Sequence, residues 1–349
     1  SAMTKLLRYE MKRNLLPAVV FTAIACLIVG IVYMTSDLFY TSTAPGGNGG
    51  IAYFPIDSMI SAPTIVLAVL CIAVPVMQFS YRMKGRDIDL WYSLPVTREK
   101  LTFARTLGGL MLIFVPYTLS YWLGFAVLLV RENHFVLHGY PLYYLSSLPL
   151  GALLFGVYSF LYTRANTVGD GLVCMAGWTF ALMLPFAFLG VWFPRLDLPR
   201  SFSVWQLSPF GLLSWAADYF NELICADALP SLLPLAWTIP LAALEGAGAY
   251  AGLFLTARGH KAENGGQLSS SLWCYRVLVP LYMFTLASSL SVDALGAQLA
   301  LIAGAFLLVG GFICFIVYRR SFRLKTSDIL TLAVAFGAGV LVSVLFGIF

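Results

Sequence analysis

Glu245 is the side chain whose type and position most invite chemistry, because it is a single carboxyl group deep inside an apolar run, 237–256. An ionised carboxylate at the centre of a bilayer costs about 2.5 kcal/mol or more, so such a group is protonated, hydrogen-bonded or turned toward a cavity. Two interpretations remain open: a structural hydrogen bond to a neighbouring helix, or contact with a substrate or coupling ion. Gly246, Gly248 and Gly252 provide small faces for close helix packing, which favours the structural interpretation.

Other catalytic patterns do not emerge from the sequence. A phosphate-binding loop needs Gly-x-x-x-x-Gly-Lys-Ser/Thr, and the sequence contains no Gly-Lys dipeptide, so this chain cannot hydrolyse ATP alone. His134 and His138 are four residues apart but lack a third ligand, so we expect no metal site. The six cysteines form no Cys-x-x-Cys pair and predict neither disulfides nor a metal site. We therefore expect no enzyme activity and no cofactor on this chain.

The composition indicates a membrane protein. Of the 349 residues, 60% are hydrophobic and only 11% are charged, whereas soluble domains carry about 25% charged residues. A helix needs about 20 apolar residues to cross the hydrocarbon layer, and lipid offers no hydrogen bonds to an open backbone. The apolar runs are continuous rather than alternating, which predicts helices. We predict an all-α integral membrane protein with nine transmembrane helices, near residues 15–35, 59–81, 104–130, 142–162, 172–193, 237–256, 272–291, 297–318 and 329–349.

The basic residues indicate the orientation of these spans. If the N-terminus is cytoplasmic, all of the 21 Lys and Arg residues except Arg131, Arg195 and Arg200 lie on or beside the inner segments. An excess of Lys and Arg marks the cytoplasmic side. We therefore predict a cytoplasmic N-terminus and a multi-pass protein of the cell membrane, most simply a bacterial plasma membrane.

Several segments outside the spans carry their own signals. Ser1 and Ala2 precede Met3 and have the look of a tag remnant, and residues 1–14 otherwise predict an interfacial amphipathic helix. The Gly-rich stretch 44–50 predicts a linker between helix ends. Within 194–236, apolar residues at helical spacing predict an amphipathic outer helix over 209–225.

The inner loop 82–103 is the most organised polar segment. Asp87 and Asp89 stand where the dipole of a short helix favours anions, Trp91 and Tyr92 contribute to an apolar side, and Pro95 ends the helix. These features predict an amphipathic helix over 86–94. An ordinary positively charged loop lying on lipid headgroups explains the same residues equally well.

A family resemblance begins in this loop. The run from Ser93 to Leu101, Ser-Leu-Pro-Val-Thr-Arg-Glu-Lys-Leu, with Ala104 to Gly108 after it, resembles the loop that joins the second and third spans of ABC transporter type-2 permeases. Leu6 to Arg13 is similar to the family's interfacial helix, and helix 209–225 resembles its outer helices. Arg258, Glu263 and Gly265 resemble the exit from its sixth span. The resemblance covers 3 to about 268.

The resemblance implies a division of the chain and a set of partners. Residues 15–268 would form a six-helix permease core, and 269–349 would add three helices, as in the longer permeases of the antibiotic-efflux and acetoin-utilisation kind. Two cores would pair, as identical or related subunits in the lipid bilayer, each with a separate ABC ATP-binding subunit that carries ATP and Mg²⁺. No nucleic acid is implied. The residues implied to contact the ATPase are Arg86, Asp87, Asp89, Leu90, Trp91, Tyr92 and Leu94, helped by helix 4–14.

The expected function is that of the permease subunit of an ATP-driven exporter. The nearly uncharged spans favour an apolar or amphipathic cargo, such as a peptide antibiotic, a drug or a lipid. One alternative is an ion-coupled secondary transporter that uses Glu245, and another is a membrane scaffold or sensor that transports nothing.

Overall fold

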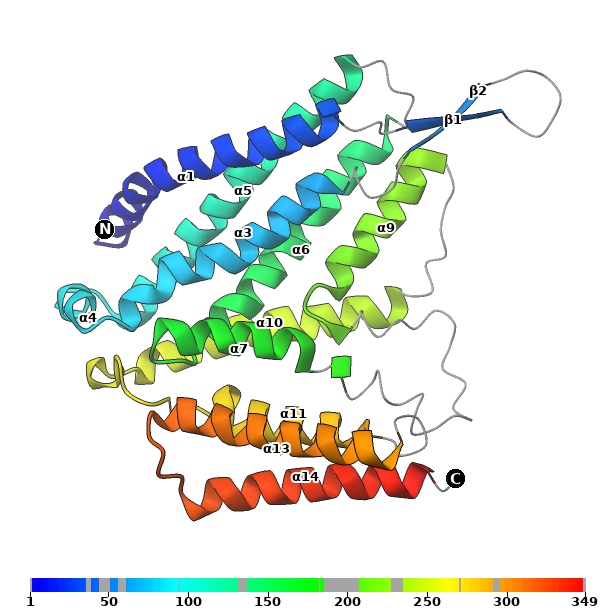
Figure 1. The fold of residues 1–349 in the computed structure, drawn as a ribbon. Helices are drawn as coiled ribbons and strands as arrows, with labels where there is room; N and C mark the ends of the chain where they lie inside the picture. The colour runs from blue at the N-terminus through cyan, green and yellow to red at the C-terminus, as the bar shows by residue number, and fades with distance from the viewer. Residues whose placement is uncertain are drawn as a thin grey trace. The chain divides into compact units, whose positions relative to one another are not determined.

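The computed structural model shows a chain built almost entirely of helices (Figure 1). The only strands among the described residues are β1 (Phe39–Thr43) and β2 (Ile51–Pro55), which pair antiparallel with Phe39 opposite Pro55. Residues 44–50, predicted as a linker between helix ends, lie outside the described residues. The structure describes residues 2–35, 39–43, 51–55, 61–93, 95–130, 137–181, 183–184, 207–226, 235–269, 271–290 and 296–347.

Seven of the described helices are long and apolar enough to cross a membrane. A helix pairs most of its backbone N–H and C=O groups within itself, which lipid requires because it offers no hydrogen bonds, and this is why long apolar runs fold as helices. The predicted all-α membrane architecture is thus confirmed at this level. The seven helices are α1 (Ala2–Thr35), α3 (Ala62–Phe79, extended by a 3-10 turn to Arg82), α5 (Arg98–Val130), α6 (Gly139–Tyr162), α10 (Leu235–Gly259), α13 (Ala297–Arg319) and α14 (Thr326–Gly347).

The two remaining predicted spans are helical but shorter in the described part of the chain. The span predicted over 172–193 corresponds to α7, Val168–Ala181, and residues 185–193 lie outside the described residues. The span predicted over 272–291 is divided into a π-helical turn, Leu272–Arg276, and α11, Val277–Ser288. The backbone at Cys274 is not helical (φ −99°, ψ −147°), which interrupts the apolar run near its start.

Two short helices lie where the sequence predicts amphipathic helices. Helix α4 spans Gly85–Tyr92, within the loop between α3 and α5, and α9 spans Gly211–Ala226. A further 3-10 turn, Ala262–Asn264, follows α10. Helices α4 and α9 coincide with two of the three segments predicted as amphipathic helices, with boundaries shifted by one or two residues. The third, the predicted interfacial helix at 1–14, is not separate from the first span but continues into it as the single helix α1.

The described chain divides into two compact units. Unit 1 comprises residues 1–80, 90–160 and 209–260, and unit 2 comprises residues 81–89, 161–208 and 261–349. The predicted division at residue 268 is a separate expectation, drawn from the family resemblance.

Unit 1 is organised around the packing of α1 and α3 on α5 (Figure 1). Helix α3 is the most buried of the seven long helices, whereas α1 exposes a row of large apolar side chains that includes Leu16 and Val19. Water does not stabilise such a surface, but lipid does, because hydrocarbon chains are as apolar as the side chains. Gly109 of α5 lets Phe155 of α6 approach so closely that an added Cβ would lie 2.5 Å from its ring.

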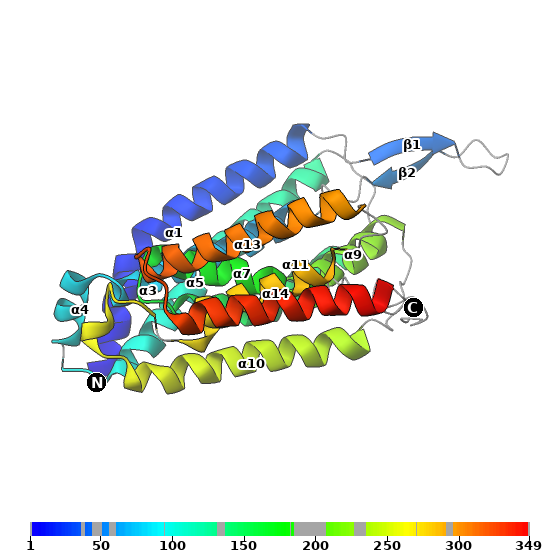
Figure 2. The same cartoon turned by 60° about the horizontal axis from the view of Figure 1, so that its bottom comes forward.

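In unit 2, α11 packs against α7, α13 and α14 (Figure 2). Gly339 of α14 lies against the backbone of α11, where a Cβ would come within 2.6 Å of the Phe284 carbonyl oxygen. Small residues at such crossings allow helix backbones to approach closely. The outer sides of α13 and α14 expose Leu301, Phe306 and Val334, as expected of lipid-facing helices.

Candidate functional site

Helix α4 is the best-defined polar element that is not a membrane span. The backbone N–H groups of Asp87 and Ile88 both donate to the Lys84 carbonyl at 3.0 Å, and Asp87 lies in the first turn, where the helix dipole favours a carboxylate. At the other end the Ser93 hydroxyl donates to the Leu90 carbonyl at 2.8 Å. The segment predicted as an amphipathic helix over 86–94 therefore forms a short helix with hydrogen bonds at both of its ends.

The residues predicted to meet a partner fall into two groups by exposure. Arg86 and Asp89 are exposed, and Leu90 is 65% exposed. Asp87 is half-buried, as are Trp91 and Tyr92. Leu94 lies outside the described residues. Arg86, Asp89 and Leu90 are thus the members of the set best placed to contact another protein.

Trp91 instead points toward the membrane helices of unit 1. The guanidinium of Arg105, on α5, lies 4.0 Å from the centre of the Trp91 ring, and that of Arg13, on α1, lies 5.4 Å from it. The Tyr9 ring is 6.0 Å from the Trp91 ring. Cations over an indole face are attracted by its quadrupole, the more so when water is excluded. Trp91 therefore fixes the end of α4 to α1 and α5.

One buried carboxylate balances these cations. Glu10 on α1 forms ion pairs with Arg13 (Nη2 to Oε2, 2.7 Å) and with Arg105 (Nε to Oε1, 3.2 Å). The side chains of Glu10 and Arg105 are only 1% and 3% exposed, so the attraction acts in a medium of low dielectric constant. Arg13 also donates to the Gln78 amide oxygen at 3.0 Å. We call these five residues the anchor cluster: Glu10, Arg13, Gln78, Trp91 and Arg105.

A second set of contacts holds the beginning of α5. The Tyr92 hydroxyl and His260 Nδ1 are 2.9 Å apart, and the Arg98 guanidinium lies 4.7 Å from the centre of the Tyr92 ring while donating to the His260 carbonyl. Glu99 pairs with Arg258, near the end of α10. These contacts join the ends of α4, α5 and α10 in unit 1.

The anchor cluster consists of ion pairs, one side-chain hydrogen bond and cation–π contacts. Its single carboxylate is engaged by two guanidiniums, and it contains no nucleophile paired with a general base. The described side chains contain no group of three or more potential metal ligands. The arrangement links Trp91, at the end of α4, to α1, α3 and α5 of unit 1, because four elements contribute side chains to one cluster.

Glu245 lies on α10 beside a cavity of about 10 Å³, enough for about one water molecule. Its neighbours there include Leu153, Leu154 and Leu212, and one carboxyl oxygen is buried without a hydrogen-bond partner among the described residues. Gly246 packs on Leu153 so tightly that a Cβ would lie 2.3 Å from it. No hydrogen bond from the described part of the neighbouring helices reaches this oxygen, and both interpretations of Glu245 stay predictions.

A buried tyrosine cluster in unit 1 had not been singled out from the sequence. Tyr117 and Tyr121 on α5 face Tyr140 and Tyr143 on α6, and all four side chains are fully buried. The Tyr121 hydroxyl donates to the Tyr140 carbonyl at 2.6 Å. Their spacing of three and four residues, which places each pair on one helix face, is the signal that could have revealed the cluster.

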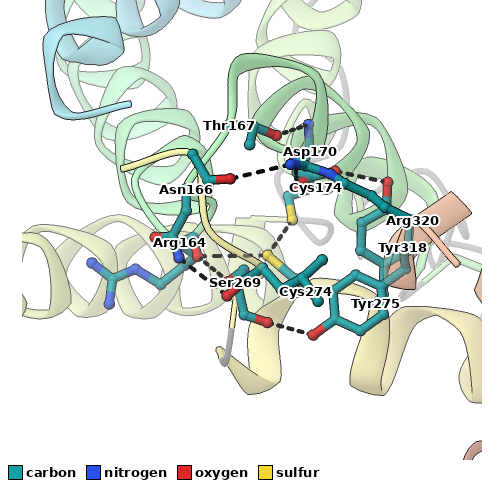
Figure 3. A network of polar contacts seen from close by, with 12 residues as sticks. Arg164, Asn166, Thr167, Asp170, Cys174, Ser269, Cys274, Tyr275, Tyr318 and Arg320 are labelled. Carbon is teal, nitrogen blue, oxygen red and sulfur yellow. Dashed lines mark hydrogen bonds and ion pairs between the residues drawn. The ribbon is translucent and has the colours of Figure 1, made fainter. Parts of the chain in front are cut away.

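In unit 2 a polar network joins the segment after α6 to the segment before α11 (Figure 3). The Ser269 hydroxyl donates to the Arg164 carbonyl at 2.7 Å, and the Gly266 N–H donates to the Asn166 carbonyl at 2.9 Å. Gly266 has a φ of +77°, a conformation that glycine adopts at no steric cost. We call the whole set the loop network: Arg164, Asn166, Asp170, Gly266, Ser269, Tyr275, Tyr318 and Arg320.

Asp170 is the carboxylate of the loop network. It accepts a hydrogen bond from the Tyr275 hydroxyl at 3.2 Å and lies 3.9 Å from Arg320. Next to it, the sulfur atoms of Cys174 and Cys274 are 2.7 Å apart as free thiols, a pairing that the sequence did not predict (Figure 3). Burial, together with the neighbouring Arg82, lowers the pKa of Arg164 to about 10.

No family model, curated protein or solved structure matches this chain.

Proposed function

We propose that this chain is the membrane-spanning permease subunit of an ATP-driven exporter, in which a separate ATP-binding subunit docks on α4. The observation that carries the proposal is the joint between Trp91 and the buried Glu10–Arg105 pair. A loop that merely rests on lipid headgroups has no need of a desolvated ion pair, whose formation costs several kcal/mol per ion before the attraction is counted. A helix that must transmit force does need a rigid attachment.

The exposed side of α4 fits a docking role. Arg86 and Asp89 offer a partner one charge of each sign. Leu90, which precedes the anchored Trp91 in the sequence, offers it an exposed apolar side chain. A displacement of α4 would be transmitted through the anchor cluster to α1 and α5, whose packing along their length makes them move together. ATP and Mg²⁺ would belong to the partner, because this sequence has no phosphate-binding loop. A second permease copy would complete the pathway for an apolar or amphipathic cargo.

The test is co-purification of the natively expressed protein in mild detergent, followed by mass spectrometry of the proteins that accompany it. We expect a stoichiometric partner with a phosphate-binding loop. Exchanging the charges of α4 in the Arg86→Glu, Asp89→Lys double variant should reduce recovery of that partner at least tenfold, without affecting membrane insertion. The matched control is Lys261→Glu with Glu263→Lys, which exchanges two exposed charges in another non-membrane segment. Equal recovery from both variants would refute docking on α4.

A second candidate function is ion-coupled transport through Glu245. It is favoured by the buried carboxyl oxygen that has no partner among the described residues. This candidate predicts that the purified chain moves cargo in vesicles without any ATPase, and that Glu245→Gln abolishes the transport. If transport strictly requires ATP and a partner, and Glu245→Gln retains it, the second candidate is excluded.

A further inference from the structure

An open groove lies between the first turns of α3 and helix α9, both in unit 1. Its volume is about 450 Å³, within the range of sites that bind drug-sized molecules. Residues from both helices line it, so its shape depends on how α9 packs on the membrane-spanning part of the unit. By the predicted orientation of the chain, this end of α3 is the outer end.

Most of the exposed surface in the groove is apolar, although half of its lining residues are polar. Ile65, Phe210 and Leu213 contribute apolar surface. The uncharged polar groups are the hydroxyls of Ser61, Thr64 and Ser214 and the amide of Asn221. Asp218 is the only residue with a formal charge among the described residues that line it. An apolar site with a few well-placed polar groups is the usual design for binding small molecules.

The sign of the charge selects the ligand. A carboxylate at the edge of an apolar groove attracts cations and repels anions, and the interaction strengthens as a ligand excludes water. The Phe210 ring can add attraction for an organic cation through its π face. A small inorganic cation would leave the apolar walls unused, so charge and surface together fit a cation that carries an apolar body.

The floor of the groove is rigid. Thr64 is hydrogen-bonded to the Tyr143 hydroxyl, and the Tyr143 ring stacks on Phe220 of α9 with centroids 5.1 Å apart. Tyr143 belongs to the buried tyrosine cluster, whose members are hydrogen-bonded across α5 and α6. A preformed floor lowers the conformational entropy lost on binding.

We propose that this groove binds an amphipathic organic cation, which would be the cargo of the proposed exporter. The role of this cation as cargo rests on the proposed function, but its binding in the groove does not. A lipid with a cationic headgroup shares part of this chemistry. A free cation is favoured because the described residues that line the groove include no positively charged side chain that could hold a lipid phosphate.

The experiment measures binding of tetraphenylphosphonium to the purified full chain in detergent by isothermal titration calorimetry, without ATPase. Asp218→Asn should weaken binding at least tenfold. Glu222→Gln is the matched control, because Glu222 is an exposed carboxylate one turn further along α9 that does not line the groove. Ala68→Phe, which places a ring in the groove, should also abolish binding, and circular dichroism verifies that each variant is folded.

Three results would overturn the proposal. Asp218→Asn could bind as tightly as the wild type, Glu222→Gln could lose as much affinity as Asp218→Asn, or neutral triphenylphosphine oxide could bind as tightly as the cation. A phospholipid retained in native mass spectra and lost only in Ala68→Phe would assign the groove to lipid instead. If the groove binds the cation but native co-purification recovers no ATPase, the site stands and the exporter is refuted. If the ATPase co-purifies but the groove does not bind the cation, only the site is refuted.

Discussion

The anchor cluster of unit 1 and the loop network of unit 2 perform a similar task with different chemistry. Each ties a short segment outside the membrane spans to helix ends. The anchor cluster relies on ion pairs between side chains, with Glu10 and Arg105 almost completely buried. The loop network relies mainly on hydroxyl and backbone groups, as in the Ser269 hydroxyl bonded to the Arg164 carbonyl. Its one carboxylate, Asp170, lies 3.9 Å from a half-exposed Arg320.

The difference predicts how much stability each cluster loses when one of its residues is substituted. Removing one partner of a buried ion pair leaves a charge in a medium that cannot solvate it, which costs about 3–5 kcal/mol. Removing one neutral hydrogen bond costs about 1 kcal/mol. A buried ion pair therefore suits a segment that must move as one body with the membrane helices. Neutral hydrogen bonds are sufficient for a loop that only has to keep its conformation.

The largest expected effect comes from Glu10→Gln. The substitution keeps the shape of the side chain but removes the counterion of Arg105, so we expect a loss of about 3–5 kcal/mol in the free energy of unfolding. Thermal unfolding in detergent, followed by circular dichroism, measures it. In the double variant Glu10→Gln, Arg105→Met the buried cation is gone as well, and part of the stability should return. A double variant less stable than the single one would contradict a charge-based joint.

Trp91→Ala is expected to have the next largest effect. It removes the ring over which Arg13 and Arg105 lie, and because Trp91 is half-buried we expect a loss of about 2 kcal/mol. The variant should still recover the ATPase partner through the exposed residues of α4, while transport-coupled ATP hydrolysis falls. Trp91→Phe keeps an aromatic face and should retain most of both properties. Loss of partner binding in Trp91→Phe would show that Trp91 is itself a docking residue.

Sequence alone predicted the elements but not their pairing. Continuous uncharged runs predicted the long helices, and Asp87, Trp91 and Pro95 predicted α4, because these signals are local. The contact between Tyr92 and His260 joins residues 168 positions apart. Only the packing of α5 and α10 brings them together, so no periodicity reveals it.

The same limit explains the site residues that sequence reasoning missed. Glu10 was assigned to an interfacial helix, but its burial depends on α1 packing along α5, which places Arg105 beside it. Cys174 and Cys274 are separated by 100 positions and meet through the π-helical turn at 272–276, a backbone feature with no residue signature. The span predicted over 272–291 is short for the same reason.

The loop network should be less sensitive to substitution than the anchor cluster. Ser269→Ala removes the hydrogen bond to the Arg164 carbonyl, and we expect a loss of about 1 kcal/mol in the free energy of unfolding. Thr331→Ala, whose hydroxyl is exposed on α14, is the control and should change little. Thermal unfolding of both variants under identical detergent conditions measures the difference. A loss in Ser269→Ala that matches that of Glu10→Gln would erase the distinction between the two clusters.

The smallest effect is expected at an ion pair that has the chemistry of the anchor cluster without its burial. Arg258 and Glu99 pair in unit 1, but their side chains are 73% and 40% exposed, so water solvates either charge when the other is removed. Arg258→Met should therefore cost less than about 1 kcal/mol. At 0.5 M salt the Debye length is about 4 Å, so screening should reduce even that loss. Glu10→Gln should be insensitive to the same salt, because ions do not reach a buried pair. If the two variants lose equal stability, or respond equally to salt, burial is not what distinguishes the anchor cluster, and the rigid attachment of α4 would need another explanation.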